Sequence, residues 1–138
     1  MNQELGSVNK ITSFTNLDAW KEGHTLALMI YKETEYFPKK EMFGLVSQMR
    51  RSAVSVTSNV AEGFGRQSYK EKIQFYSIAQ GSVTELQSQL YVAKDVGFTA
   101  EKIFHNIMEQ SIKVHKIING LIKGARRFIP HSLFLAYS

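Results

Sequence analysis

The sequence predicts an all-α chain that folds as an up-down-up-down antiparallel four-helix bundle. Only two prolines occur, Pro38 and Pro130, and they bracket about ninety residues without a helix breaker. Along that stretch apolar residues recur at alternating steps of three and four, the spacing of helices that pack at small crossing angles. Strands of alternating Val, Ile and Thr are missing from the sequence. Connections of about two to five residues between the predicted helices make neighbouring helices antiparallel.

The first helix is predicted near residues 16–36, after an N-terminal arm of residues 1–14. Thr15 and Asp18 have the spacing of a capping box at its start. One face of the helix carries Leu17, Trp20, His24, Ala27, Tyr31 and Thr34. Residues 26–31 are apolar on the remaining faces as well. A helix that is apolar nearly all round is usually buried on more than one side, so we expect this helix to lie partly between subunits.

The second helix is predicted near residues 40–63, with Glu41 in its first turn, where a carboxylate suits the helix dipole. Its apolar stripe is Leu45, Met49, Ala53, Val56 and Val60. Gly63 suits the left-handed position just past the C-terminus, because a residue without Cβ adopts that conformation without steric cost. Ser68 and Glu71 then form the capping box that starts the next helix.

The third helix, near residues 69–97, has the most regular apolar seam of the chain. The seam is Tyr76, Ala79, Val83, Leu86, Leu90 and Ala93. Gly97 ends this helix, and Thr99 is placed to cap a fourth helix near residues 100–126. The stripe of the fourth helix is Ile103, Ile107, Val114, Ile118 and Leu121. Residues 15–127 are therefore predicted to form one helical domain.

The composition is that of a water-soluble globular protein, with 43% apolar and 21% charged residues. Its longest apolar run, residues 26–31, is far too short to span a membrane. Residues 1–10 lack a secretory pattern, and a chain without cysteine forms no disulfides. We therefore expect a cytoplasmic protein with no membrane partner. The apolar tail, residues 128–138, is expected to pack on its own bundle or on a neighbour, and insertion into a membrane surface is the alternative.

Polar residues gather where the second and third helices should face each other. They are Gln48, Arg51, Ser55, Asn59, Glu62, Arg66, Ser82 and Glu85. Such a set is either a shared polar binding site or a hydrogen-bond network that fixes helix register and subunit orientation. We favour the structural network. Arg51 and Glu85 are expected to pair, because either charge alone in a dry seam would be costly.

No catalytic motif accompanies this polar set. The chain lacks a P-loop, a dinucleotide fingerprint and a nucleophile elbow. No glutamate is followed three residues later by histidine, which removes a di-iron site of the ferritin type. His105 and Glu109 share a helical face, but two ligands do not make a metal site. His24 is interpreted as a core or interface residue. The sequence therefore predicts neither a catalytic residue, nor a metal, nor a cofactor.

The net charge of +5 lies in the last quarter of the chain. Residues 1–101 hold 11 basic and 11 acidic side chains, whereas residues 102–138 hold six basic side chains against Glu109 alone. The six are Lys102, Lys113, Lys116, Lys123, Arg126 and Arg127. All but Arg126 belong to a line of eight positions that step alternately by four and three and also include Asn106, Glu109 and Gly120, so a basic ridge is predicted along the fourth helix. The ridge is either a solvated face that complements the helix dipole or a surface that contacts phosphates of RNA or DNA without sequence preference.

With the helices placed, the sequence resembles a known family of four-helix bundles. The matching residues are Phe37-Pro38; Leu45, Gln48 and Arg51; Ser55, Asn59, Ala61, Glu62, Gly63 and Arg66; Ala79, Gly81, Ser82, Glu85 and Leu86; and Gly97-Phe98. The family was first noticed as proteins encoded by intervening sequences within 23S ribosomal RNA genes, and its members also carry the label S23 ribosomal protein. The resemblance covers roughly residues 14–124.

The resemblance implies a homopentameric ring and no catalytic residues. It also implies kinship with the accessory protein of diversity-generating retroelements, a basic pentamer thought to bind nucleic acid and a partner reverse transcriptase. The leading hypothesis is therefore a non-enzymatic homo-oligomer that binds nucleic acid through repeated basic faces. The alternative is a scaffold that binds another protein, such as a reverse transcriptase, with the charge serving only solubility.

Overall fold

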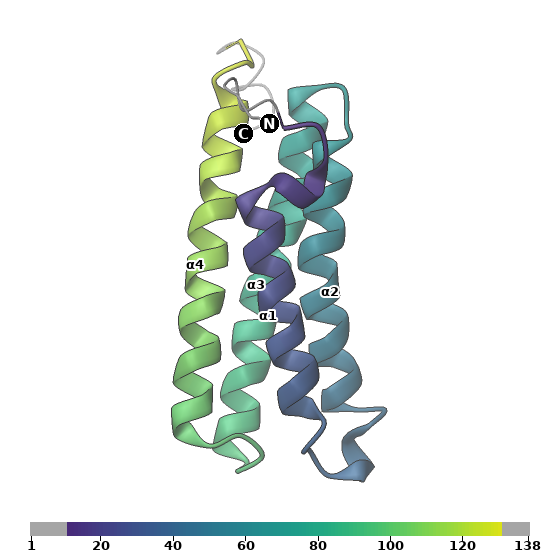
Figure 1. The fold of residues 1–138 in the computed structure, drawn as a ribbon, viewed down its shortest axis with the longest axis vertical. Coiled ribbons are helices and arrows are strands. Elements are labelled where there is room, and N and C mark those ends of the chain that lie inside the picture. Colours follow the sequence, from purple (N-terminus) through teal and green to yellow (C-terminus); the bar gives the residue numbers. More distant parts are fainter. Residues whose placement is uncertain (1–10, 131–138) are drawn as a thin grey trace, which may run out of the picture.

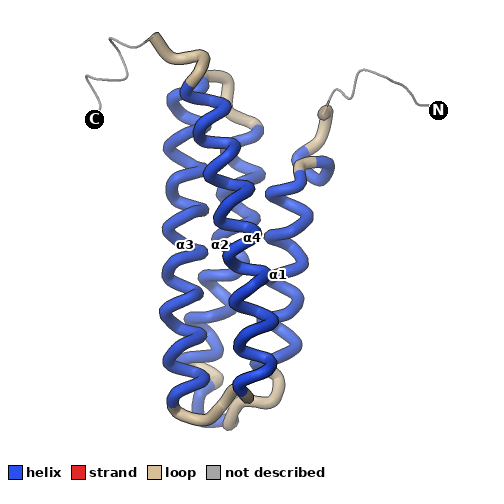
Figure 2. Tube along the Cα trace, turned by 90° about the vertical axis from the view of Figure 1, so that its left-hand side faces the viewer, coloured by secondary structure: helices blue, strands red, loops and turns tan. Residues whose placement is uncertain are grey.

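The computed structural model describes residues 11–130 as four helices packed side by side (Figures 1 and 2). They are α1 (Asp18–Thr34), α2 (Leu45–Phe64), α3 (Tyr69–Asp95) and α4 (Glu101–Arg126), with 3-10 turns η1 (Phe14–Asn16) and η2 (Lys39–Glu41). Each helix runs antiparallel to the next, and α1 also packs against α4, which closes the bundle. No strand occurs within the described range. The prediction of an all-α four-helix bundle is confirmed.

The core is built from the seams that the sequence predicts best. Every residue of the predicted α3 seam, from Tyr76 to Ala93, is buried. On α2, Met49, Ala53, Val56 and Val60 are buried, and Leu45 packs at the edge of the core. The regular three-four spacing thus faces inward on both helices, as helices at small crossing angles require. No helix of the described chain is long and apolar enough to cross a membrane.

The predicted inward faces of α1 and α4 are partly wrong. The buried residues of α1 are Ala19, Gly23, Leu26, Ala27, Ile30 and Thr34. His24 and Tyr31, predicted on the seam, are exposed, and His24 stacks on Trp20 with ring centroids 4.7 Å apart. The core face of α4 consists of Phe104, Ile107, Ser111, Val114, Ile118, Ile122 and Ala125. Its true line begins at Phe104 rather than Ile103, which is 40% exposed.

Two of the three predicted N-terminal caps are wrong. Ser68 does cap α3, because its Oγ accepts a hydrogen bond from the Glu71 backbone N–H at 3.1 Å. Thr15 lies inside η1, and α1 begins after Leu17 without a side-chain cap. Thr99 is buried and α4 begins after Ala100, again without a side-chain cap. The α1 and α4 starts therefore depend on packing rather than on capping.

The helices are also shorter than the sequence suggests at two ends. The predicted residues 35 and 36 are not part of α1, and α2 begins at Leu45 rather than at residue 40. The 3-10 turn η2 and Gly44, whose φ and ψ are both −112°, precede α2. Glu41 nevertheless serves the start of α2, because its Oε1 accepts from the Leu45 N–H at 3.3 Å. A carboxylate at that position also suits the helix dipole.

Gly63 has a different role from the predicted one. It lies within α2, and among the described residues Gly97 is the glycine with a positive φ, 87°. A Cβ built on Gly63 would lie 2.6 Å from Cε1 of Tyr76 on α3. Gly63 is therefore a close-approach residue between α2 and α3. Gly97 ends α3 as predicted, with the Phe98 N–H bonded to the Ala93 carbonyl at 2.9 Å.

Candidate nucleic-acid interface

The bundle concentrates its charge at one end. There α2 ends, α3 begins and α4 ends, next to one another (Figure 1). Residues 60–76 and 115–130 of this region, which we call the basic end, hold seven basic residues against Glu62 and Glu71. The seven are Arg66, Lys70, Lys72, Lys116, Lys123, Arg126 and Arg127. The rest of the chain has ten basic and ten acidic side chains, so the basic end carries the whole net charge of +5.

The opposite end of the bundle is close to neutral. Residues 31–50 and 91–105 hold six basic and five acidic side chains. Lys102, one of the predicted nucleic-acid contacts, lies at this end, about 30 Å along α4 from Lys123 at the helical rise. The basic residues of the predicted ridge therefore do not form one cluster in the structure. Its C-terminal part joins the basic residues of the α2–α3 connection instead.

The cations of the basic end differ in how far they are already neutralised. Lys116, Lys123 and Arg127 are exposed and form no ion pair with any described residue. Arg66, in contrast, is held by Glu62 at 2.5 Å and by Glu71 at 3.7 Å, and its guanidinium covers the Phe75 ring. The exposed, unpaired cations are the ones that can exchange counterions for phosphates.

Lys72 is fixed at the centre of the basic end. Its ammonium donates hydrogen bonds to the Phe64 carbonyl at 2.7 Å and to the Gly63 carbonyl at 3.3 Å. These are terminal carbonyls of α2 that have no partner within the helix, so Lys72 acts as its C-terminal cap. Burial lowers the pKa of Lys72. The sequence gives no sign of this role, since the lysine belongs to the next helix.

Lys113, also predicted to contact nucleic acid, has a partner within the bundle. Its Nζ lies 3.4 Å from Oε1 of Glu22 on α1. Gln110 donates to the same carboxylate oxygen and to the Glu22 backbone carbonyl, both at 2.9 Å. These contacts, the Gln110 hydrogen bond foremost, lower the pKa of Glu22 below its ordinary value of 4.5. Lys113 and Gln110 therefore tie α4 to α1.

We expect Glu22→Gln to destabilise the bundle in a pH-dependent way. A lowered folded-state pKa means that the charged carboxylate adds stability above the unfolded-state pKa, and that this stability is lost as the pH falls through the folded value. The difference between the two proteins should be at most about 1 kcal/mol at pH 7, because the site is partly exposed. It should begin to shrink near pH 4.5, the ordinary value, and vanish once the pH is below the lowered folded-state pKa. Urea unfolding at several pH values measures it, and a difference that is constant with pH would contradict this role.

The predicted polar set forms only part of the expected network. Ser55 and Ser82 share a hydrogen bond of 2.8 Å between α2 and α3. Asn59 donates to the backbone carbonyl and to Oγ of Ser55, at 2.8 and 3.1 Å. Glu62 and Arg66 pair with each other one turn further on.

The expected pair between Arg51 and Glu85 is wrong for the single chain. Both side chains are exposed, as is Gln48, and no ion pair joins them within residues 11–130. Water screens these charges, so the dry seam that would have required pairing does not exist here. Gln48, Arg51 and Glu85 instead stand on the outer surface of α2 and α3.

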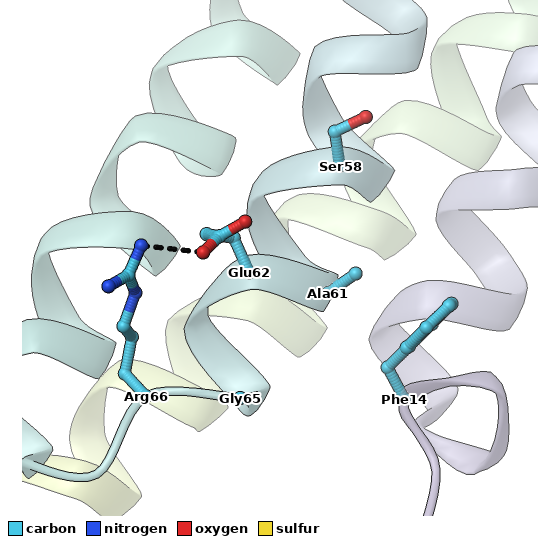
Figure 3. Close-up of a pocket in the computed structure, with 6 residues that line it drawn as sticks. All are labelled: Phe14, Ser58, Ala61, Glu62, Gly65 and Arg66. Carbon is cyan, nitrogen blue, oxygen red and sulfur yellow. Dashed lines mark hydrogen bonds and ion pairs between the residues drawn. The ribbon is translucent and has the colours of Figure 1, made fainter.

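A cleft lies beside this polar set, between η1 and the end of α2 (Figure 3). It measures about 560 Å³ and is lined by Phe14, Ser58, Ala61, Glu62, Gly65 and Arg66. Its arginine is already neutralised by Glu62, so the cleft does not favour a phosphate. No group of three or more His, Cys, Asp or Glu that could hold a metal occurs in the described part of the chain. Nε2 of His105 lies 3.5 Å from Oε2 of Glu101.

Sequence reasoning missed an aromatic pair at the basic end. Tyr69, the first residue of α3, stacks on Phe128, just beyond α4, with ring centroids 4.4 Å apart and an interplanar angle of 15°. The two residues are far apart in sequence, and nothing in the local pattern of either segment indicates that they meet. The predicted tail, residues 128–138, begins at Phe128, and its residues 131–138 lie outside the described range.

Comparison with known proteins shows the family to which the chain belongs. The model of the family described as 23S rRNA-intervening sequence protein matches residues 15–120. The chain belongs to this family. The match takes in α1, α2, α3 and most of α4, whereas Lys123, Arg127 and Phe128 lie beyond it. A search of curated proteins gave no match.

The same fold also occurs in a crystal structure. That structure is of a protein of unknown function from the S23 ribosomal protein family of Bacteroides thetaiotaomicron. The two chains superpose with a TM-score of 0.71, over 76% of this chain and 98% of the other, at 20% sequence identity. At this identity the likeness establishes the shared helical fold.

Proposed function

We propose that this protein is a non-enzymatic subunit of a homopentamer that binds nucleic acid through its basic ends. The observation that carries the proposal is the placement of the whole net charge at one end of the bundle, where Lys116, Lys123 and Arg127 are exposed and unpaired among the described residues. Each cation that neutralises a phosphate releases counterions, which drives binding without sequence preference. A cytoplasmic location fits such a role.

The exposed surface supports assembly. Ile78 and Val92 on α3 are 52% and 48% exposed, and Leu28 on α1 is 56% exposed. Apolar groups that line one face, as Ile78 and Val92 do, are typical of surfaces that another chain covers. The number five comes from the family resemblance, not from these residues. Five copies would bring a total formal charge of about +25 to one particle and add weak phosphate contacts as avidity.

Salt dependence of binding tests the nucleic-acid role. The affinity for a single-stranded oligonucleotide should fall steeply as salt rises, and Lys123→Gln with Arg127→Gln should flatten the slope by about 0.7 for each phosphate that is no longer neutralised. The matched control is Lys39→Gln with Lys40→Gln, which removes the same charge from two exposed lysines at the neutral end. That control should keep nearly the full slope. Equal effects of the two variants would mean that the basic end is not the binding surface.

A second candidate function is a scaffold that binds another protein, a reverse transcriptase being one possibility. The observation that favours it is Phe43, which is 97% exposed in the connection before α2, beside Met42 at 48%. With Tyr31, Val54 and Arg51 they line a groove of about 450 Å³. If the protein forms a pentamer but has no measurable affinity for any nucleic acid at low salt, the scaffold function explains the protein better than nucleic-acid binding.

A further inference from the structure

A groove crosses the basic end between the start of α3 and the end of α4. It measures about 340 Å³, within the range of small-molecule sites, roughly 300–1,000 Å³. Its lining is Tyr69, Lys72, Tyr76, Gly120, Leu121, Gly124, Ala125, Arg127 and Phe128. A Cβ placed on Gly120 or Gly124 would meet nothing within 4 Å, so the α4 side of the groove is open and flat.

The stacked pair forms an exposed aromatic platform at the groove. Phe128 is 64% and Tyr69 is 40% exposed, so the two rings stack on each other while much of their surface faces water. Fixed aromatic rings of this kind give a base a stacking surface, whatever the base, because every base has a π-face. The pair is already ordered by its own contact, which reduces the entropy lost on binding.

Polar groups in the groove are placed for the rest of a nucleotide. The Arg127 guanidinium is exposed and has no ion-pair partner among residues 11–130. The Lys72 ammonium has three N–H donors, of which the Phe64 and Gly63 carbonyls take two. One donor therefore remains, and no carboxylate lines the groove to compete with a phosphate.

We propose that this groove binds one unpaired nucleotide of a single-stranded nucleic acid, with the base on the Phe128–Tyr69 pair and the phosphate at Arg127 and Lys72. This inference rests on the proposed function and extends it, because charge alone would not distinguish a base from a bare sugar–phosphate chain. Arg127 and Phe128 lie beyond the residues that the family model matches, so the site depends in part on residues outside that match.

A groove at the opposite end of the bundle, lined by the exposed Phe43, argues against a generic surface effect. Phe43 stacks on no ring of the described residues, and it lies at the end whose charges nearly cancel. A partner recognised by apolar contact alone would fit that end as well as the basic end. The combination of an ordered aromatic pair, unpaired cations and no carboxylate occurs at the Tyr69–Phe128 groove.

The test compares a thymidine strand of about 12 nucleotides with an abasic strand of equal length, by fluorescence anisotropy at low salt. The wild type should bind the thymidine strand about tenfold more tightly, the effect of one stacked base. A uridine strand should show the same ratio, since stacking does not depend on the sugar. Tyr69→Leu with Phe128→Leu should bring the ratio to about one, and Phe43→Leu should leave it unchanged.

The possible failures separate the two proposals. If the wild type binds the thymidine and abasic strands equally and Lys123→Gln with Arg127→Gln weakens both, the basic end binds nucleic acid but the nucleotide site is wrong. A ratio that survives Tyr69→Leu with Phe128→Leu also overturns the site. If no strand binds at low salt, the proposed function itself fails. Both rings are partly exposed, so we expect Tyr69→Leu with Phe128→Leu to remain folded. Circular dichroism melts of each variant check this.

Discussion

Gly63→Ala should destabilise the bundle by about 2 kcal/mol, although alanine is the better helix former. The added Cβ would lie 2.6 Å from Cε1 and 2.8 Å from Cδ1 of Tyr76, and 3.2 Å from Cβ of Phe75. Tyr76 is 4% exposed and its ring has little room to move. Relief therefore requires α2 and α3 to separate, which strains the contact between two helices that carry much of the core.

Two comparisons identify the cause. Gly120→Ala on α4 adds the same methyl group where nothing lies within 4 Å, and it should stabilise the protein by up to about 1 kcal/mol. In a Tyr76→Leu background the cost of Gly63→Ala should shrink, because the ring carbons that the methyl meets are gone. Urea unfolding gives the four free energies of the cycle. Purely additive values would show that the Gly63–Tyr76 contact is not the source of the cost.

Gly63 also shows where local sequence signals stop being informative. A glycine near the end of an apolar stripe predicts a left-handed helix end as readily as it predicts a close helix crossing. Both roles need the absence of a Cβ, so the sequence alone cannot separate them. Gly97 has the first role, with its φ of 87°, and Gly63 has the second.

How well the sequence predicts the inward face of a helix depends on how many of its faces are apolar. On α3 six residues from Tyr76 to Ala93 follow strict steps of three and four, so this spacing determines the inward face although Ile78 and Val92 are apolar outside it. On α1, residues 26–31 are apolar all round, and several faces satisfy the same pattern. The true inward face includes Gly23, where a Cβ would lie 3.1 Å from Cγ2 of Thr57 on α2. A small residue that permits close approach carries no hydrophobic signal, so the pattern pointed to His24 and Tyr31 instead.

The sequence predicts the positive charge of the candidate site, but it does not predict the groove. The excess of basic residues after residue 101 is visible in the sequence, and the structure brings part of it to the basic end. The contributions of Lys72 and Tyr69 were not visible, because they depend on the start of α3 meeting the end of α4. Likewise Arg51 and Glu85 look paired by spacing, yet both face water in the single chain.

Ile78→Lys with Val92→Lys should break the proposed assembly into single chains. Ile78, Glu85 and Val92 recur every seven residues on α3, so they lie on one face of the helix. Ser82, at the edge of this face, bonds to Ser55 on α2, whereas Gln87 on another side bonds to Ser111 on α4. The face therefore adjoins α2. Two lysines there would cost the single chain little, since both positions are about half exposed.

If another chain covers this face, the two lysines should strongly destabilise the assembly, because every subunit contact would have to bury two unpaired ammonium groups. Light scattering should then fall from about five times the chain mass of 15.7 kDa to that mass itself, with the helical circular dichroism unchanged. Ser77→Lys with Thr84→Lys is the control, which adds the same charge at two exposed sites one position before Ile78 and Glu85, on the side of α3 nearer α4. It should leave the mass intact. If Ile78→Lys with Val92→Lys also leaves it intact, the α2–α3 surface is not where the chains meet.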